Sequence, residues 1–302
     1  MAFVKRIFLF LILNFLVCMT ISFLLNFFHV RPYLSSFGLD IPSLMVTCFI
    51  WGMAGALISL SLSRITAKWM MGVQVVDPDT NDLQARELIG LVRELANEAS
   101  LPMPQVGVFR SQEPNAFATG PTRSRSLVAV STGLLQRMNQ NQLKGVLAHE
   151  LSHIANGDMV TMTLLQGVVN AFVLFLSRIL AYFFSGLMRS RGGNSRDHSY
   201  ASFWMFSILF EIVFMILGSL VVAAYSRWRE FRADAGGAHL AGKESMISAL
   251  RGLQNLQDIR DTTAGERPAY AALGISSRKR GWISFFATHP SLEKRIERLE
   301  LS

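Results

Sequence analysis

The chain of 302 residues contains little cysteine and little charge. Its two cysteines, Cys18 and Cys48, both lie inside long apolar runs, which excludes a disulfide-stapled fold and a cysteine-based metal site. Charged residues make up 17% of the chain, against about 25% in a typical soluble domain, while 51% of the residues are hydrophobic. This composition is too apolar for a wholly soluble protein, so part of the chain must lie in a lipid bilayer.

The charge that is present is unbalanced, with 29 Lys and Arg against 21 Asp and Glu and a net charge of +8. Such an excess fits either a nucleic acid or an anionic membrane surface as partner. A nucleic-acid role needs a basic stripe with interleaved aromatic residues, and anionic lipid explains basic clusters such as residues 278–280 equally well. We therefore expect a lipid partner and no nucleic-acid binding.

Four apolar runs are candidates for membrane helices. The first two, residues 7–28 and 41–62, carry no charge and are long enough to cross a hydrocarbon core of about 30 Å. A cleaved signal peptide is the alternative for the first run, but the run is too long and no small-residue cleavage site follows it. Because Arg64 and Lys68 follow the second run, the positive-inside rule places the N-terminus and the chain after Arg64 in the cytoplasm.

The third and fourth runs, residues 160–184 and 202–225, are weaker candidates because they contain Arg178 and Glu211. A charge inside a membrane is costly, so Glu211 should face a neighbouring helix or a wet cavity, and Arg178 should either pair with it or extend to the interface. If both runs span, the Arg-rich loop 190–196 between them is extracytoplasmic, which the positive-inside rule disfavours. Complete spanning and partial embedding of these two runs both stay open.

The other residues have the composition of a soluble domain and come in two pieces. Residues 83–100 have apolar residues at helical spacing, and residues 106–109 and 127–130 are short β-prone runs, which predicts an α+β fold. The expected protein is mostly α, with about four hydrophobic helices and a split α+β cytoplasmic domain. The expected divisions are 1–70 for two N-terminal transmembrane helices, 71–158 for the first part of the soluble domain, 159–225 for the third and fourth hydrophobic helices, and 226–302 for the second part.

The strongest chemical signal is the pattern His-Glu-x-x-His formed by His149, Glu150 and His153, within a stretch whose composition predicts a helix. Residues four apart share one helix face, so the two imidazoles can bind one metal ion, and Glu150 lies beside them to accept a proton from a water molecule. Zinc is the natural occupant of such a site. We therefore expect one zinc ion per chain.

Two histidines leave a catalytic zinc ion one protein ligand short, and no third histidine follows within a few residues of His153. A distant carboxylate is the next option. Glu230 and Asp234 share one helical face after the fourth run, so Glu230 can bind the metal while Asp234 holds a ligand imidazole by its second nitrogen. The alternative is a solvated carboxylate pair balanced by neighbouring arginines. An even number of membrane crossings between His153 and Glu230 puts both on the same side and favours Glu230.

These motifs, together with residues 288–296 (Thr-His-Pro-Ser-Leu-Glu-Lys-Arg-Ile), resemble the membrane zinc metalloproteases that include bacterial HtpX and the CAAX prenyl proteases, and above all the HtpX type. The similarity covers essentially the whole chain. It implies a gluzincin-like zinc endopeptidase with Glu230 as third ligand, in the bacterial inner membrane with its protease domain facing the cytoplasm. The implied substrates are misfolded or damaged polypeptides, mainly membrane proteins, cleaved in quality control and stress response.

The resemblance also implies roles that the pattern leaves open. His289 and Arg295 would approach the substrate side of the zinc and stabilise the oxyanion, although the pattern alone predicts only a helix after Pro290. A stretch that the pattern allows to be a plain turn before Pro121 would be an edge strand pairing with an extended substrate. Its residues are Asn115, Ala116, Phe117 and Ala118.

Two other classes of function are possible from the sequence. A catalytically silent membrane scaffold would use the zinc structurally and would need a fourth protein ligand, but no nearby Cys or His supplies one. A transporter or channel would account for Arg178 and Glu211, but four short spans with most of the polar sequence outside lipid make a poor pore. The sequence does not predict the oligomeric state.

Overall fold

The computed structural model describes residues 38–189, 196–265 and 287–302, together with residues 19, 23, 27, 34 and 35. The described chain divides into two compact units, and each takes its residues from separate stretches of sequence. The apolar unit holds the described residues up to 60 and those from 162 to 222, and the mixed unit holds residues 61–161 and the described residues from 223 onwards. Apart from three helical positions, the predicted run 7–28 lies outside the described residues.

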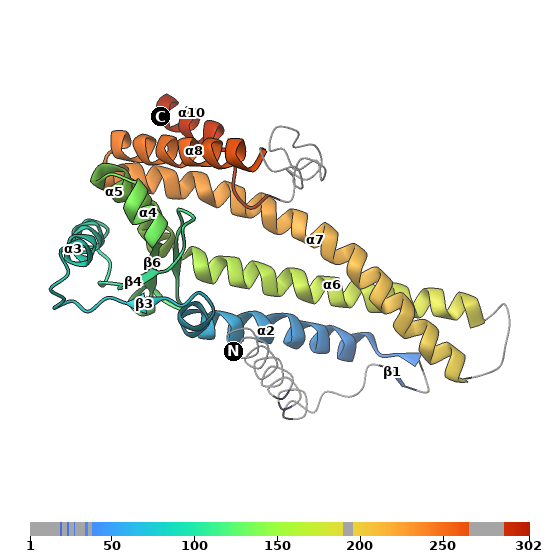
Figure 1. Cartoon of the computed structure of the whole chain (residues 1–302). Coiled ribbons are helices and arrows are strands. Elements are labelled where there is room, and N and C mark those ends of the chain that lie inside the picture. Colours follow the sequence, from blue (N-terminus) through green and yellow to red (C-terminus); the bar gives the residue numbers. More distant parts are fainter. Residues whose placement is uncertain are drawn as a thin grey trace. The chain divides into compact units, whose positions relative to one another are not determined.

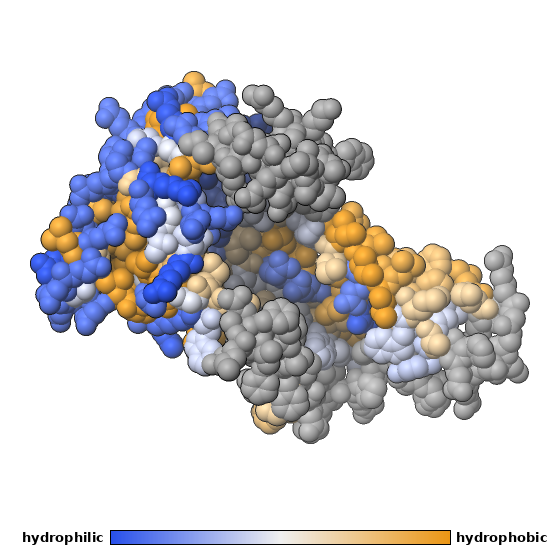
Figure 2. Space-filling model, viewed as in Figure 1, coloured by the Kyte–Doolittle hydropathy of each residue, from blue (hydrophilic) through white to orange (hydrophobic). Residues whose placement is uncertain are grey.

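Three long helices contain the apolar runs that the structure describes, namely α2 (Ile41–Met70), α6 (Asp158–Arg189) and α7 (Arg196–Ala241). Among the described residues, each contains a stretch long and apolar enough to cross a membrane, with mean hydropathy of 1.8, 1.9 and 2.5 respectively. The surface that these helices form is mainly hydrophobic, whereas the surface over the other helices is mainly hydrophilic (Figure 2). The prediction of hydrophobic helices at 41–62, 160–184 and 202–225 is confirmed, and all three helices extend beyond their apolar runs.

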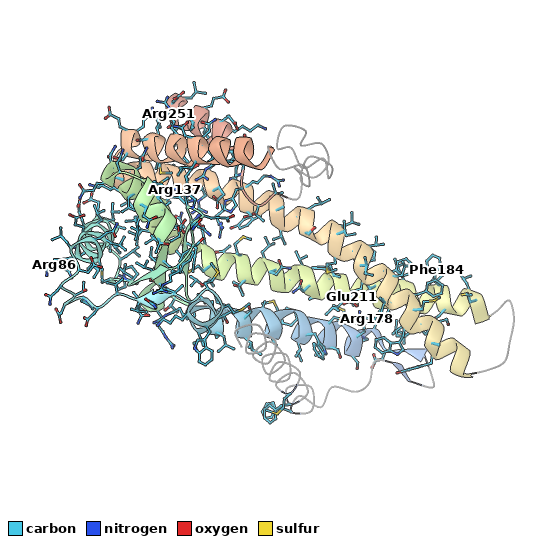
Figure 3. The ribbon with its side chains drawn as sticks, viewed as in Figure 1. Arg86, Arg137, Arg178, Phe184, Glu211 and Arg251 are labelled. Atoms are coloured by element: carbon cyan, nitrogen blue, oxygen red, sulfur yellow. The ribbon has the colours of Figure 1, made fainter. Side chains whose placement is uncertain are left out.

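Within the apolar unit, small residues let the helices approach closely (Figure 1). A Cβ atom on Gly52 of α2 would lie 2.5 Å from the backbone nitrogen of Ala171 in α6. Between α6 and α7, Arg178 Nη1 donates a hydrogen bond of 2.8 Å to Glu211 Oε2 (Figure 3). The pairing that the sequence left open is therefore present, and each charge offsets the cost of holding the other in lipid.

The mixed unit is built on a four-stranded sheet with strand order β3-β4-β6-β5. Its strands are β3 (Gln74–Val75), β4 (Gln105–Phe109), β5 (Ala116–Thr119) and β6 (Leu127–Ser131). The central pair β4 and β6 is parallel, and the two outer pairs are antiparallel. All five residues of β6 are buried, whereas the edge strand β5 is half-buried throughout. The mixed unit also contains a 3₁₀ turn, η1 (Arg123–Arg125), and the apolar unit contains the short antiparallel pair β1 (Leu34–Ser35) and β2 (Gly38–Leu39).

In the part of the mixed unit that the structure describes, five further helices occur: α3 (Leu83–Glu98), α4 (Thr132–Arg137), α5 (Gln140–Asn156), α8 (Lys243–Gly265) and α10 (Leu292–Leu301). The central one is α5, which packs against α3, α8 and β5. It starts in a capping box, where the Asn139 side chain accepts a hydrogen bond from the backbone N–H of Gln142 and the Gln142 side chain accepts one from the backbone N–H of Asn139. It ends at Gly157, which is in the left-handed conformation (φ 68°). The predicted α+β organisation is confirmed.

Glycines allow the neighbouring helices to lie close to α5. A Cβ atom on Gly145 would lie 2.5 Å from the carbonyl oxygen of Ser245 in α8. A Cβ atom on Gly237 of α7 would lie 3.1 Å from the backbone nitrogen of His149. The close approach of α7 to α5 brings two segments together that are about eighty residues apart in the sequence.

Candidate metal centre

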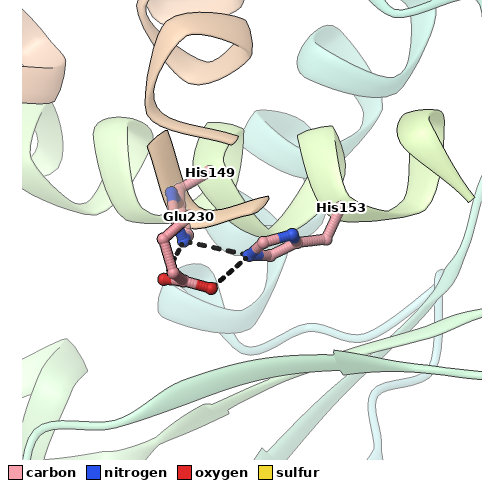
Figure 4. A group of neighbouring side chains, drawn as sticks. All are labelled: His149, His153 and Glu230. Carbon is pink, nitrogen blue, oxygen red and sulfur yellow. Dashed lines mark hydrogen bonds and ion pairs between the residues drawn. The ribbon is translucent and has the colours of Figure 1, made fainter. Parts of the chain in front are cut away.

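Three buried side chains from two helices converge on one point (Figure 4). His149 and His153 lie one helical turn apart on α5, and Glu230 comes from α7. The two Nε2 atoms are 3.1 Å apart. Glu230 Oε2 is 3.4 Å from His149 Nε2, and Glu230 Oε1 is 3.3 Å from His153 Nε2.

These distances fit a single tetrahedral ion. An ion with ligand bonds of about 2.0–2.1 Å in tetrahedral geometry has ligand atoms about 3.3–3.4 Å from one another. The three ligand atoms lie at nearly these separations, and two imidazoles with one carboxylate are a common donor set for a metal. The residues present therefore fit a bound metal ion.

The electrostatics of the site also favours positive charge between the three ligands. Burial lowers the pKa of His149, but hydrogen bonds with Asp234 and Glu230 outweigh it and raise that pKa to about 9. Burial likewise lowers the pKa of His153, and carboxylates at both of its ring nitrogens raise it overall. Burial raises the pKa of Glu230, but hydrogen bonds from the neighbouring histidines hold it well below its usual range. A cation is the species that this arrangement of charges stabilises.

A carboxylate lies at the second ring nitrogen of each imidazole. Asp234 Oδ1 is 3.0 Å from His149 Nδ1, and Asp158 Oδ2 is 2.7 Å from His153 Nδ1. Both carboxylates are almost completely buried. Such contacts fix the ring orientation and leave both Nε2 atoms free to bind a metal, which is typical of histidine ligands.

Arg295 contacts the Asp234 carboxylate that holds the His149 ring. Its Nε and Nη2 atoms donate hydrogen bonds of 2.8 and 2.5 Å to the two oxygens of that carboxylate, and the residue is 6% exposed. Burial lowers the pKa of Arg295 and raises that of Asp234, but their mutual contact outweighs burial in both, so the pair stays charged. Arg295 Nη1 is also 3.8 Å from Glu230 Oε2.

The other predicted site residues lie around this cluster. His289 precedes α10, and its Nδ1 atom is 2.7 Å from Glu230 Oε2, with the side chain 63% exposed. Glu150 is half-buried next to His149 on α5. The stretch Ala116–Thr119 forms the edge strand β5 against α5. The exposed Asn115 before it donates its backbone N–H to the Ser131 hydroxyl, and its carbonyl oxygen accepts from the backbone N–H of Ser131.

Sequence reasoning missed Asp158, the residue at His153. The signal was available in the chain, because Asp158 directly follows Gly157. A glycine that ends a helix lets the next residues turn back towards the last helical turn, and an acidic residue there can reach a histidine of that turn. Arg229, which lies close to Asp158 and Glu230, was also read only as a balancing surface charge.

Comparisons with known proteins point to one family. The sequence profile of "Peptidase family M48" matches residues 82–301. A "Protease HtpX homolog" of Methylacidiphilum infernorum is 47% identical over 297 residues, covering 98% of both chains. A protein of the same name from Bacillus subtilis is 48% identical over 304 residues, covering 98% of this chain and 99% of the relative.

A solved structure shares the fold. The crystal structure of Ste24p from S. mikatae superposes with a TM-score of 0.66 at 17% sequence identity. The match covers 99% of this chain and 66% of that longer chain. The fold described above, including its long apolar helices, is therefore shared with part of a longer chain of known structure.

Proposed function

The chain belongs to peptidase family M48 and is a membrane metallopeptidase, and from this premise we propose that it is a zinc-dependent endopeptidase. In this proposal His149, His153 and Glu230 hold one zinc ion per chain. The observation that carries it is the buried triangle of two imidazole nitrogens and one carboxylate at tetrahedral spacing. Three protein ligands leave one of four positions for water, which is typical of catalytic rather than structural zinc.

Zinc held by these three residues would supply Lewis-acid chemistry, lowering the pKa of a water molecule towards about 7 and polarising the scissile carbonyl. Glu150 follows His149 on α5 and is half-buried, so it lies beside the ligands without being one of them. In the proposed mechanism Glu150 accepts the proton of the attacking water and then donates it to the amine of the leaving peptide. Asp234 holds the His149 ring throughout.

His289 and Arg295 have different roles in the proposal because their surroundings differ. His289 is exposed and bonded to Glu230, so it can exchange this contact for a hydrogen bond to the substrate carbonyl as negative charge develops there. Arg295 is buried with two donors on Asp234. We therefore propose that Arg295 orients Asp234 and, through Asp234, the His149 ring. It also provides a positive charge near the reacting oxygen.

We propose that the polypeptide substrate binds as an extended strand along β5. This strand has one neighbour in the sheet, and among the described residues no strand pairs with its outer edge. In an antiparallel pair every second residue directs its N–H and C=O away from the partner, so part of the Asn115–Ala118 backbone is available to a substrate. Main-chain pairing is independent of side-chain sequence, which suits cleavage of varied misfolded or damaged membrane proteins in quality control.

The proposed location is the bacterial inner membrane, with the mixed unit in the cytoplasm. The basic residues Arg64 and Lys68 near the end of α2 support this orientation. The test is a chain in which Cys18 and Cys48 are replaced by serine and the exposed Ser124 by cysteine. A membrane-impermeant thiol reagent should label this chain only after cells are opened, and labelling of intact cells would reverse the orientation.

The activity is tested with the detergent-purified full-length protein and an unfolded polypeptide substrate. We expect wild type and Glu150→Gln to contain equal zinc, close to one ion per chain, and only wild type to cleave, because the substitution removes the base and spares the ligands. His153→Ala should lose zinc and cleavage together. Glu94→Gln, an exposed surface change, is the matched control.

Two results would contradict the proposal. Equal cleavage by Glu150→Gln would remove Glu150 as the base. If wild type instead binds zinc and yet cleaves neither the unfolded substrate nor membrane proteins in proteoliposomes, that result would support the catalytically silent scaffold.

A further inference from the structure

Arg229 precedes Glu230 on α7 and lies between two buried carboxylates of the metal centre. Its Nη2 atom is 3.4 Å from Glu230 Oε1, and its Nε atom is 4.0 Å from Asp158 Oδ2. The two carboxylate side chains are 0% and 2% exposed, and the Arg229 side chain is 17% exposed. Burying a guanidinium costs free energy unless it is paired, so its position between these carboxylates calls for an explanation.

A similar chain of contacts occurs at the other imidazole. Arg295 binds Asp234, and Asp234 holds His149. Arg295 also comes within 3.8 Å of Glu230 Oε2. An arginine therefore orients the carboxylate that orients a ligand, and its charge reaches one oxygen of the third ligand.

Arg229 repeats this arrangement at His153. It lies beside Asp158, the carboxylate that holds His153, and it approaches the other oxygen of Glu230. The Nε atom of Arg229 is buried without a hydrogen-bond partner among the described residues. A shift of about 1 Å would bring it to hydrogen-bonding distance of Asp158.

We propose that Arg229 is a positioning residue of the metal centre. It holds Glu230 Oε1 on the side of His153 and keeps the Asp158 carboxylate against the His153 ring, so that both ligands face the same point. The inference rests on the proposed function, because it takes the same three residues as metal ligands. It assigns no contact between Arg229 and the substrate.

Positioning and simple charge predict opposite effects on metal binding. A positive charge beside the site repels a cation, so removing it without any loss of order would tighten metal binding. If Arg229 orients the ligands, removing it leaves Glu230 and Asp158 free to turn and weakens metal binding. The direction of the change in zinc affinity therefore distinguishes a positioning role of Arg229 from a purely electrostatic one.

The experiment compares full-length wild type with Arg229→Gln and Arg229→Lys in detergent, using competition between the protein and a graded zinc chelator. We expect Arg229→Gln to bind zinc about 10–100-fold more weakly. Arg229→Lys should lie between, because it keeps the charge but lacks the planar fork. Arg232→Gln is the matched control on the same helix, since Arg232 contacts Asn156 and the Trp228 ring instead of the site carboxylates.

A second readout is the absorption spectrum of the cobalt(II)-substituted protein, which reports ligand geometry independently of cleavage. We expect the band to change in Arg229→Gln and to be unchanged in Arg232→Gln. In combination with Asp158→Asn, the loss of zinc affinity should be smaller than the product of the two single losses, because both substitutions disturb the same ring.

The inference would be overturned if Arg229→Gln bound zinc as tightly as wild type or more tightly. If Arg229→Gln does not fold, a zinc affinity of Arg229→Lys equal to that of wild type would overturn it. A failure of the proposed function has a different signature. In that case wild type and His153→Ala would retain zinc equally, whatever the behaviour of the Arg229 variants.

Discussion

At the scale of single residues, the two imidazoles of α5 are each held by a carboxylate from a different helix, His149 by Asp234 of α7 and His153 by Asp158 of α6. Asp158 is the first residue of α6, where the positive end of the helix dipole stabilises its negative charge. The carboxylate therefore serves both the start of one helix and the orientation of the His153 ring on the preceding one.

This arrangement predicts the effect of Asp158→Asn. The amide can still accept from the His153 ring, but a neutral acceptor binds it more weakly, so we expect zinc affinity to fall by about tenfold or more. The measurement is chelator competition on the purified protein. Asp79→Asn, in an exposed turn, should bind zinc as wild type does, and unchanged affinity in Asp158→Asn would mean that this carboxylate does not orient the ligand.

At the scale of elements, the turn from α5 into α6 depends on one glycine. Gly157 has a φ of 68°, and its N–H bonds back to the carbonyl oxygens of His153 and Ile154. The turn ends α5 immediately after its second histidine and starts α6 at Asp158. The backbone conformation at Gly157 therefore determines whether Asp158 can reach the His153 ring.

Gly157→Ala and Gly90→Ala form a matched pair for testing this. A Cβ atom meets nothing within 4 Å at either position, but only Gly157 has positive φ. We expect Gly157→Ala to lower the free energy of unfolding by about 1 kcal/mol, and Gly90→Ala, inside α3, to raise it by about 0.5–1 kcal/mol. Thermal unfolding in detergent measures both, and a loss of stability in both variants would contradict the role given to φ.

At the scale of the whole molecule, the chain leaves the mixed unit near residue 161 and returns to it near residue 223. The intervening helices are joined by the Arg178–Glu211 ion pair inside the apolar unit. A single unpaired charge there is more costly than no charge at all, because lipid cannot solvate it.

The pair predicts a non-additive pattern of stability. We expect Arg178→Leu and Glu211→Leu each to destabilise the protein by several kcal/mol and the double Leu variant to be close to wild type. Thermal unfolding in lipid nanodiscs measures this. Additive losses in the double variant would mean that the two charges act independently.

Metal removal is the second prediction at this scale. In the proposed site the ion would join α5 to α7, and three buried carboxylates would lose its positive charge on removal. A ligand present at a hundred times its dissociation constant stabilises by about 2.7 kcal/mol, so a strong chelator should lower the unfolding temperature of wild type markedly. The His153→Ala variant should already unfold at the lower temperature and be insensitive to the chelator, and equal sensitivity of the two would argue against this site.

The sequence by itself determined the features that depend on local periodicity. The apolar runs at 41–62, 160–184 and 202–225 predicted three long membrane-capable helices, although not where those helices begin and end. The helical repeat likewise put His149 and His153 on one face, and β-branched runs between turn residues indicated β4 and β6.

Only the tertiary structure decided which distant side chains meet. Arg295 and Asp234 are 61 residues apart, and Arg178 and Glu211 are 33 apart, yet each pair is in contact. No local pattern encodes such contacts, because they depend on how closely two helices pack and at which rotation. The close approach of α7 to α5 at Gly237 and the turn at Gly157 bring Arg229 and Asp158 to the cluster, a place that sequence reasoning had given to neither.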